Sequence, residues 1–403
     1  MLGLIILGSA ALLAFGLYYV YKKTALPAGP APGEPTGEAG QLPVAGERPL
    51  GTTGAEAPGG PGVLPEGAQI AQPAQQPPQY FKPEPVTQII SETVASPSLN
   101  NRGDMRFYNA NDGKFYRLEP DGSIKTLSAE VFYNVNKVTW AKDANKAVLE
   151  YPDNSKIIYN FDLQRQITVP KHWQDFSFSP DSSEVAAKSV GLSPENRWLI
   201  TSKDDGTGTK LLEPLGENAA RVIVDWSPNR QTVALSRTGA PQGLDRQEVL
   251  FIGLNNENFK STIVEGLDFQ PQWSPTGKKL LYSVDSARSD FKPELWVVNG
   301  YGDDIGSNRQ MLKINTWANK CSFANDDTVF CAVPRDLPQG AGMSPDIANS
   351  TYDDLYKIDL KSGLKTNVPL GSDYNFTSIS YDQKNNRVYF SDRNRSGIFK
   401  VNL

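Results

Sequence analysis

The chain has 403 residues, a formal net charge of −5, 39% hydrophobic residues and 21% charged residues. This length allows one large domain or two of ordinary size. No segment carries the strong positive charge typical of nucleic-acid-binding proteins, so we expect no nucleic acid among the partners.

The N-terminal segment predicts a membrane anchor over residues 1–23. Residues 2–21 are uncharged and largely apolar, and about 20 such residues cross the hydrocarbon core as a helix. Tyr18, Tyr19 and Tyr21 then lie at one interface, beside Lys22 and Lys23. A cleaved signal peptide is the alternative, but no basic residues precede the apolar run. We therefore predict a single-pass membrane protein.

Residues 24–85 predict a disordered linker. They are built largely from Pro, Gly, Ala, Glu and Gln and contain almost no aromatic residues before Tyr80. Such a composition cannot bury enough apolar surface to offset the entropy cost of ordering the chain. As a coil, this segment would separate its ends by roughly 40 to 45 Å. We expect it to act as a passive spacer.

Internal repeats indicate the fold of residues 86–403. The segments VDWSPNRQTVALS, FQPQWSPTGKKLLYS and FSFSPDSSEVAAKS each predict a strand ending in an aromatic residue, a tight Ser-Pro turn and a second strand. Four weaker copies complete the set. Aligned on the aromatic position, the copies fall at Ala95, Trp140, Phe178, Trp226, Trp273, Phe323 and Tyr381. The gaps between them, 38 to 58 residues, bracket the length of a propeller blade.

These repeats predict an all-β, seven-bladed β-propeller, with six or eight blades as alternatives. We expect the aromatic residue of each repeat to pack between neighbouring blades. The last repeat has only three strands before Leu403, whereas VTQII at residues 86–90 resembles a spare fourth strand. We expect this segment to pair with the last blade and close the ring, since closure removes exposed sheet edges.

The repeated [FW]-S-P pattern resembles the propeller repeats of TolB-like proteins and of the N-terminal domains of dipeptidyl peptidases, and it is WD-repeat-like in kind. The match spans residues 86–403 and is best at residues 178–188, 226–236 and 273–283. The resemblance implies a propeller that binds proteins in the cell envelope. The chain departs from TolB in its predicted anchor and in lacking a recognisable separate N-terminal α/β domain. It also lacks the hydrolase domain that follows the propeller in the peptidases.

The two cysteines, Cys321 and Cys331, flank a predicted tight hairpin. If Phe323 faces Val329, the two cysteines lie directly opposite one another, at a separation that permits a disulfide. A disulfide would indicate an oxidising compartment outside the cytoplasm. Two buried thiols are the alternative. The lysines after the apolar segment favour a cytoplasmic location by the positive-inside rule, so the location predicted here, periplasm or cell surface, depends on the cysteines.

The sequence offers few catalytic groups. Its one histidine, His172, is interpreted as an ordinary surface or core residue, and no nucleophile elbow or zinc-binding motif is present. The acidic segments 204–206 and 303–304 do not complete a calcium loop and are interpreted as hairpin turns. We expect no cofactor and no metal.

The loops predicted to join second and third strands are the long ones, at residues 190–198, 237–248, 283–294 and 333–354. Long loops on a rigid scaffold are where such folds place binding sites. Arginines recur in these loops and in the last blade, and their planar guanidinium groups suit carboxylates and phosphates. The candidate binding residues are Arg197, Arg237, Arg246, Arg288, Arg335, Arg393 and Arg395. The alternative is that each pairs with a local acid, such as Glu195, Asp245, Asp290 or Asp336.

Three functions are compatible with these features. The leading hypothesis is a noncatalytic, membrane-anchored propeller outside the cytoplasm that binds an envelope protein or peptide through its long-loop face and is itself monomeric. The second is an enzyme of the lyase, cyclase or glycan-active kind, with ionisable residues converging in the central funnel. The third is a scaffold facing the cytoplasm.

Overall fold

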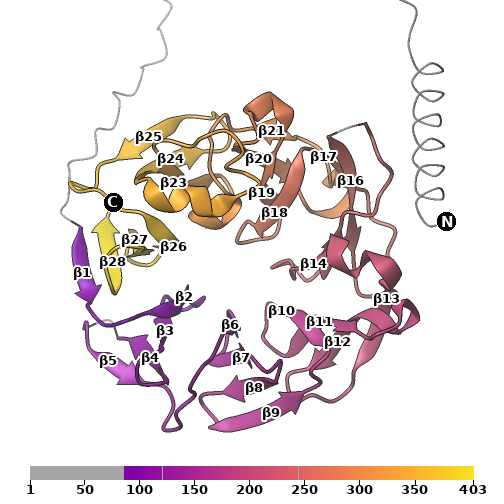
Figure 1. The fold of residues 1–403 in the computed structure, drawn as a ribbon, viewed down its shortest axis with the longest axis horizontal. Helices are drawn as coiled ribbons and strands as arrows, with labels where there is room; N and C mark the ends of the chain where they lie inside the picture. Colours follow the sequence, from indigo (N-terminus) through magenta and orange to yellow (C-terminus); the bar gives the residue numbers. More distant parts are fainter. Residues whose placement is uncertain (1–85, 120, 244) are drawn as a thin grey trace, which may run out of the picture. The chain divides into compact units, whose positions relative to one another are not determined.

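The computed structural model describes residues 86–119, 121–243 and 245–403. These residues form seven four-stranded antiparallel sheets. Figure 1 shows the sheets arranged around a central axis, with β1 beside β28, so that the two ends of the propeller share one sheet. The seven-bladed prediction is therefore confirmed, and the alternatives of six and eight blades are wrong.

The first three blades follow one another along the chain, and each sheet runs from its innermost to its outermost strand in sequence order. Blade 1 comprises β2 (Ala95–Leu99), β3 (Met105–Asn109), β4 (Lys114–Leu118) and β5 (Ile124–Thr126). Blade 2 comprises β6 (Lys137–Trp140), β7 (Lys146–Glu150), β8 (Lys156–Asn160) and β9 (Arg165–Val169). Blade 3 comprises β10 (Trp173–Phe178), β11 (Glu184–Val190), β12 (Arg197–Lys203) and β13 (Lys210–Pro214).

The next three blades repeat this order. Blade 4 comprises β14 (Val222–Val224), β15 (Ala234–Ser236), β16 (Arg246–Ile252) and β17 (Thr262–Glu265). Blade 5 comprises β18 (Leu267–Trp273), β19 (Lys279–Asp285), β20 (Pro293–Asn299) and β21 (Gln310–Met311). Blade 6 comprises β22 (Cys321–Asn325), β23 (Thr328–Pro334), β24 (Asp353–Asp359) and β25 (Lys365–Val368).

Blade 7 combines both ends of the propeller. It comprises β26 (Phe376–Asp382), β27 (Arg387–Asp392), β28 (Ile398–Asn402) and β1 (Thr87–Ile90). Thr87 pairs with Lys400 and Ile90 with Ile398 in antiparallel register. The predicted closure is confirmed.

Short 3-10 helices occur in the connections between strands, both within blades and between them. They are η1 (Pro194–Asn196), η2 (Gly216–Arg221), η3 (Ala287–Ser289), η4 (Gly302–Asp304), η5 (Ala318–Lys320) and η6 (Pro345–Ser350). None of the helices in the described part of the chain has the length and apolarity needed to cross a membrane. The predicted anchor, residues 1–23, and the predicted linker, residues 24–85, lie outside the described residues.

The serine of each strong repeat closes its own turn. The hydroxyls of Ser179, Ser227 and Ser274 accept hydrogen bonds of 2.9 to 3.0 Å from the backbone N–H five residues later, at the start of the second strand or just before it. The proline that follows each serine presets its backbone for the turn and donates to no ladder. The Ser-Pro pair therefore both ends the first strand and fixes the start of the second.

The aromatic residue before the serine packs between blades, as predicted. Trp226 contributes to an apolar cluster with Leu199 of blade 3, and Trp273 to one with Phe251 of blade 4. Both indoles are more than nine-tenths buried.

The first repeat is four residues out of register with the prediction. Ser96 and Pro97 lie inside β2, not in the turn, and Ser96 has a φ of 49° at an irregularity in the pairing with β3. The turn instead begins at Asn100, whose side-chain oxygen accepts hydrogen bonds from the N–H groups of Arg102 and Asp104. Leu99, not Ala95, therefore occupies the aromatic position of this blade. Asparagine replaces serine because its amide oxygen can cap the same kind of turn.

Gly397 makes the closing sheet pair possible. Its φ is +99°, and a Cβ atom there would lie 1.7 Å from the carbonyl oxygen of Ile90. We expect Gly397→Ala to lower the free energy of unfolding by about 3 kcal/mol or more, because a strained φ and a backbone clash add together. Urea unfolding followed by circular dichroism measures the change.

Gly371→Ala is the matched control. Gly371 also has a positive φ, of +73°, but nothing lies within 4 Å of a Cβ atom built there. We expect this variant to lose only about 1 kcal/mol, from backbone strain alone. Equal losses in the two variants would contradict the close approach of Gly397 to Ile90, because the clash would then add nothing to the cost of backbone strain.

Candidate functional site

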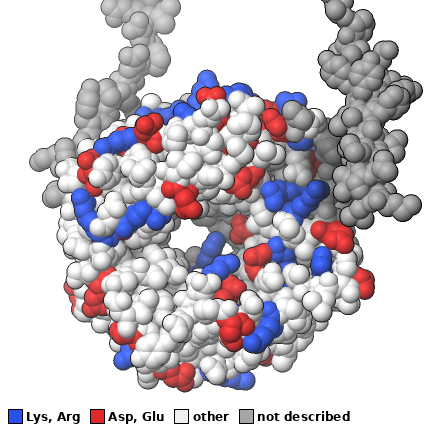
Figure 2. Space-filling view, in the orientation of Figure 1, with Lys and Arg blue, Asp and Glu red and all other residues white. Residues whose placement is uncertain are grey.

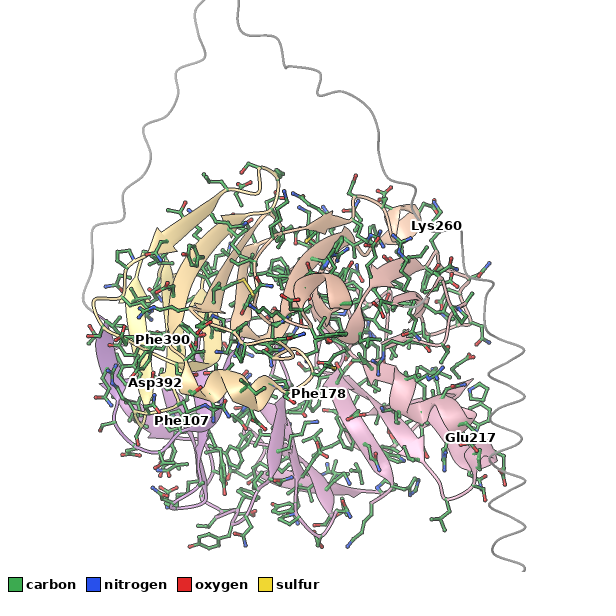
Figure 3. The ribbon with its side chains drawn as sticks, turned by 45° about the horizontal axis from the view of Figure 1, so that its top comes forward. Phe107, Phe178, Glu217, Lys260, Phe390 and Asp392 are labelled. Atoms are coloured by element: carbon green, nitrogen blue, oxygen red, sulfur yellow. A yellow bond between two sulfur atoms is a disulfide. The ribbon has the colours of Figure 1, made fainter. Side chains whose placement is uncertain are left out.

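The long loops share one face of the propeller. In each blade the connection from second to third strand leaves at the same end of the sheet as the linker to the next blade, and the Ser-Pro turns leave at the other end. We call these the long-loop face and the turn face. In Figure 3, Phe178 lies near the centre of the ring, whereas Glu217 and Lys260 lie at its periphery.

The arginines of blades 3 and 4 are held by local groups. Arg197 begins β12, donates to the carbonyl oxygens of Gly191 and Leu192 at 3.1 Å, and lies 3.6 Å from Glu217. Arg237 donates to the carbonyl oxygen of Ala220 at 3.5 Å. Both arginines therefore brace loops of the propeller.

Arg246 and Arg288 belong to an ionic network between blades 4 and 5. Both contact Glu265, at 2.8 and 3.1 Å, and Arg309 contacts the same carboxylate at 2.7 Å. Burial acts to raise the pKa of Glu265, but the arginines hold it below its ordinary value. Arg288 and Arg309 also lie over the ring of Trp296, each 5.5 Å from its centroid. This network holds two blades together and leaves little free charge for a ligand.

The arginines of blades 6 and 7 differ from one another. Arg335 is paired with Asp354 at 2.8 Å and Asp373 at 2.6 Å, and Arg395 lies over the ring of Tyr374. Arg393 is exposed and has no ion pair among the described residues.

Four of the seven candidate arginines, Arg197, Arg246, Arg288 and Arg335, are therefore paired with acids among the described residues. The acids that pair with these arginines are not Glu195, Asp245, Asp290 or Asp336, the partners suggested by proximity in sequence. They come from other strands and from neighbouring blades, which the order of the sequence does not reveal.

A cleft of about 190 Å³ surrounds Arg393 on the long-loop face. It lies between the 335–352 loop of blade 6, the linker before β22 and the start of β26. Its lining includes Gln270, Trp317, Asn319, Lys320, Asp346, Asn349, Asn375, Thr377 and Arg393.

The 335–352 loop is tied to both neighbouring blades. On one side the N–H groups of Gly340 and Gly342 donate to the carbonyl oxygens of Asp290 and Phe291 in blade 5, at 2.8 and 2.7 Å. On the other side the side-chain amide of Asn375 donates to the carbonyl oxygens of Ala348, Asn349 and Thr351. Such anchoring at both ends makes this long loop an ordered platform.

A buried ion pair lies beneath the cleft. Lys320 Nζ contacts both carboxylate oxygens of Asp353, at 2.9 and 2.8 Å, and Asp353 also accepts a hydrogen bond from the N–H of Phe376. Burial raises the pKa of Asp353, and the charge of Lys320 opposes that rise. The pair joins the η5 segment, β24 and β26 under the floor of the cleft.

The 335–352 loop also covers a carboxylate that lacks a partner. Asp285 is 1% exposed, and neither of its carboxylate oxygens has a hydrogen-bond partner among the described residues. Gly342 lies directly against it, since a Cβ atom there would be 2.4 Å from the Asp285 Cβ. Burial, and secondarily the charge of Asp268, raise the pKa of Asp285 to about 6.

The two cysteines are joined in the structure. Cys321 pairs with Cys331 and Phe323 with Val329 in the β22–β23 hairpin, which confirms the predicted register. The sulfur atoms form a disulfide, and both residues are buried at the interface between blades 5 and 6.

The remaining candidate groups occupy ordinary positions. His172 is exposed in the linker between β9 and β10. The acidic segments 204–206 and 303–304 lie in third-to-fourth-strand connections, as predicted, where Asp205 accepts hydrogen bonds from the backbone N–H and hydroxyl of Thr207. Within the described ranges, no three His, Cys, Asp or Glu side chains are grouped so that they could hold a metal ion.

Solved structures similar to this chain include an enzyme and a propeller domain of another kind of protein. Oligogalacturonate lyase from Vibrio parahaemolyticus is 12% identical with a TM-score of 0.53, over 79% of this chain and 93% of its own. The propeller domain of Cps50 (Swd1) from Myceliophteria thermophila is 12% identical with a TM-score of 0.51, over 79% and 99%. An oligogalacturonate lyase in complex with manganese is 11% identical with a TM-score of 0.51, over 80% and 98%. No protein-family model and no curated protein sequence matches the chain.

These likenesses support the WD-repeat-like propeller and show the fold alone. At such low identity, a shared fold does not imply shared site residues. The function of this chain therefore depends on its own surfaces.

Asp285 predicts a pH-dependent difference in stability. The pKa of Asp285 is raised in the folded state, so the folded protein binds this proton more tightly than the unfolded chain does. The free energy of unfolding is therefore highest when Asp285 is protonated, and it falls as the pH rises through about 6. We expect Asp285→Asn to melt at a higher temperature than the wild type at pH 7.5, and this gain to shrink as pH falls to about 4.

Thermal unfolding by circular dichroism across that pH range measures the difference. Asp336→Asn removes one exposed negative charge from the 335–352 loop, which covers Asp285, and serves as the control. A gain for Asp285→Asn that is the same at every pH would contradict the assignment of this group.

Proposed function

We propose that the chain is a noncatalytic, membrane-anchored binding module that takes an envelope protein or peptide on its long-loop face. The observation that carries this proposal is the ordered 335–352 platform. It is fixed by main-chain and amide hydrogen bonds to both neighbouring blades and exposes three apolar side chains, Met343 at 57%, Ile347 at 40% and Tyr352 at 44%.

The chemistry of this platform suits a polypeptide ligand. A loop that is already ordered loses little conformational entropy on binding. Exposed apolar groups beside a cleft that contains polar and charged side chains combine the two kinds of group that protein interfaces use. Arg393 supplies a cation in that cleft that has no ion pair among the described residues, and a guanidinium suits a carboxylate of the partner.

The anchor and the compartment belong to the same proposal. The apolar run of residues 2–21 supports retention at a membrane. The Cys321–Cys331 disulfide supports a location outside the cytoplasm, because disulfides persist in oxidising compartments and are rare in reducing ones.

Photo-crosslinking tests the binding face. A benzoyl-phenylalanine at position 343 of the full chain, expressed in its native membrane, should yield a discrete crosslinked species, and Ile347→Asp in the same chain should abolish it because a charge opposes burial of the platform. The matched control carries the probe at Leu364, which is 65% exposed on the turn face. The same crosslinked species from both positions, or its persistence with Ile347→Asp, would contradict the proposal.

Protease treatment of intact cells tests the compartment. We expect propeller fragments to be released without lysis once any outer barrier is permeabilised, because the propeller lies outside the inner membrane. Mass spectrometry after thiol blocking should recover the 321–331 hairpin with its disulfide intact. A protected propeller with two free thiols would place it in the cytoplasm instead.

A further inference from the structure

The turn face holds a larger cavity than the long-loop cleft. It measures about 610 Å³ and is lined by the first strands or turns of blades 1, 2, 5, 6 and 7. Figure 2 shows the central opening of the ring, with basic side chains visible inside it.

Three cations from three blades line this cavity. They are Arg102 of blade 1, Lys142 of blade 2 and Lys384 of blade 7, and none of them has an ion pair among the described residues. The one acid in the lining, Asp382, is buried and already bound by Arg387 at 2.9 Å and by the Asn385 side chain at 2.7 Å. The cavity therefore has an excess of positive charge.

The two neighbouring turns of blades 1 and 2 are fixed in position. Arg106 is completely buried and donates to the carbonyl oxygens of Ala141 and Ala144, both at 2.8 Å, while its guanidinium lies 4.7 Å from the centroid of the Trp140 ring. Burial lowers its pKa to about 10, so it remains charged at neutral pH. Asn101 N–H also donates to the carbonyl oxygen of Lys142, at 2.9 Å.

The third cation sits on an equally ordered turn. Asp382 accepts a hydrogen bond from the backbone N–H of Lys384, at 3.1 Å, in addition to its contacts with Arg387 and Asn385. The backbone positions of all three cations are thus set before any ligand arrives, which reduces the entropy cost of binding.

The rest of the lining is mostly polar and uncharged. It includes Ser98, Gln272, Ser322, Ser380 and Gln383. Lys142 also lies near Asp225 of blade 4, whose pKa burial raises to about 6 while the charge of Lys142 opposes that rise. One carboxylate does not balance three cations, so a net positive charge remains.

We propose that this turn-face cavity binds a small multivalent anion carrying two or more carboxylate or phosphate groups. One charge pair at a solvated site is worth only about 1 kcal/mol, so useful affinity requires several anionic groups meeting several cations. A ligand that bridges Arg102, Lys142 and Lys384 would also link blade 7 to blades 1 and 2 across the seam where the ring closes. The site lies on the face opposite the proposed protein-binding platform and is independent of it.

Calorimetry on the detergent-solubilised full chain tests this proposal, with citrate and pyrophosphate as the two probes and citrate trimethyl ester as the uncharged control. We expect at least one probe to bind, with affinity reduced about tenfold by Lys142→Ala or Lys384→Ala and reduced again when salt is raised from about 50 to 500 mM. The bound probe should also raise the melting temperature. The probe that binds more tightly distinguishes a carboxylate from a phosphate ligand.

Lys278→Ala is the matched control, because Lys278 is exposed in the β18–β19 turn of the same face but outside the cavity. Its affinity for the probe should change less than twofold. The ligand-free melting temperature of each variant separates loss of binding from loss of folding. The proposal is overturned if neither probe binds or if only an acidic peptide such as hexaglutamate binds. It is also overturned if the ester binds as well as citrate, or if Lys278→Ala weakens binding as much as Lys142→Ala.

Discussion

The constraint on which the whole structure depends is closure of the ring by β1. Seven sheets in a ring each have a neighbour on both faces, but the ring is covalently open between blades 7 and 1. Main-chain pairing of β1 with β28 places the segment before blade 1 in the sheet of blade 7, so the gap is bridged by backbone hydrogen bonds. Gly397 lies at this join because only a residue without a Cβ atom allows the two backbones to meet.

Once the ring is closed, buried cations and indole groups join neighbouring blades through backbone carbonyls. Arg106 of blade 1 donates to blade 2, and Lys188 of blade 3 donates to the carbonyl oxygens of Ala219 and Val222 at the start of blade 4. Trp273 Nε1 of blade 5 donates back to Asp225 of blade 4. Burying a cation is costly unless acceptors surround it, so these contacts favour the arrangement in which each buried cation meets the carbonyl oxygens of the next blade. Apolar packing alone would tolerate sliding between blades.

Much of this architecture is predictable because short sequence patterns determine the strands and the turns. Period-two alternation and turn chemistry each act over fewer than about 15 residues, and together with the spacing of 38 to 58 residues between repeats they predict the blade number, the Cys321–Cys331 register and the closing strand. The first blade was misaligned for a local reason: Ser96-Pro97 copies the turn signal, whereas the turn is made by Asn100. The sequence signal for this turn is Asn100 with Gly103 three residues later, since Asn100 caps the turn and Gly103 has a positive φ.

The site could not be predicted in the same way. Glu265 gathers Arg246, Arg288 and Arg309, which lie 19 to 44 residues away in sequence and on two blades. The turn-face cavity likewise combines Arg102 with Lys384, from opposite ends of the propeller. Contacts between side chains of different blades depend on how the blades are placed about the axis. The spacing of the repeats does not specify the direction of these side chains.

The ring architecture also explains why one propeller can offer two unrelated surfaces. Strands cross the ring from one face to the other, so the long loops and the short turns are separated by the full length of the packed sheets. The platform at Met343 and the cations at Lys142 and Lys384 share no partner among the described residues, and substitutions at such separated positions are expected to act additively. The separation of the two faces follows from the propeller fold, whereas the chemistry of each face depends on the side chains of its loops and turns.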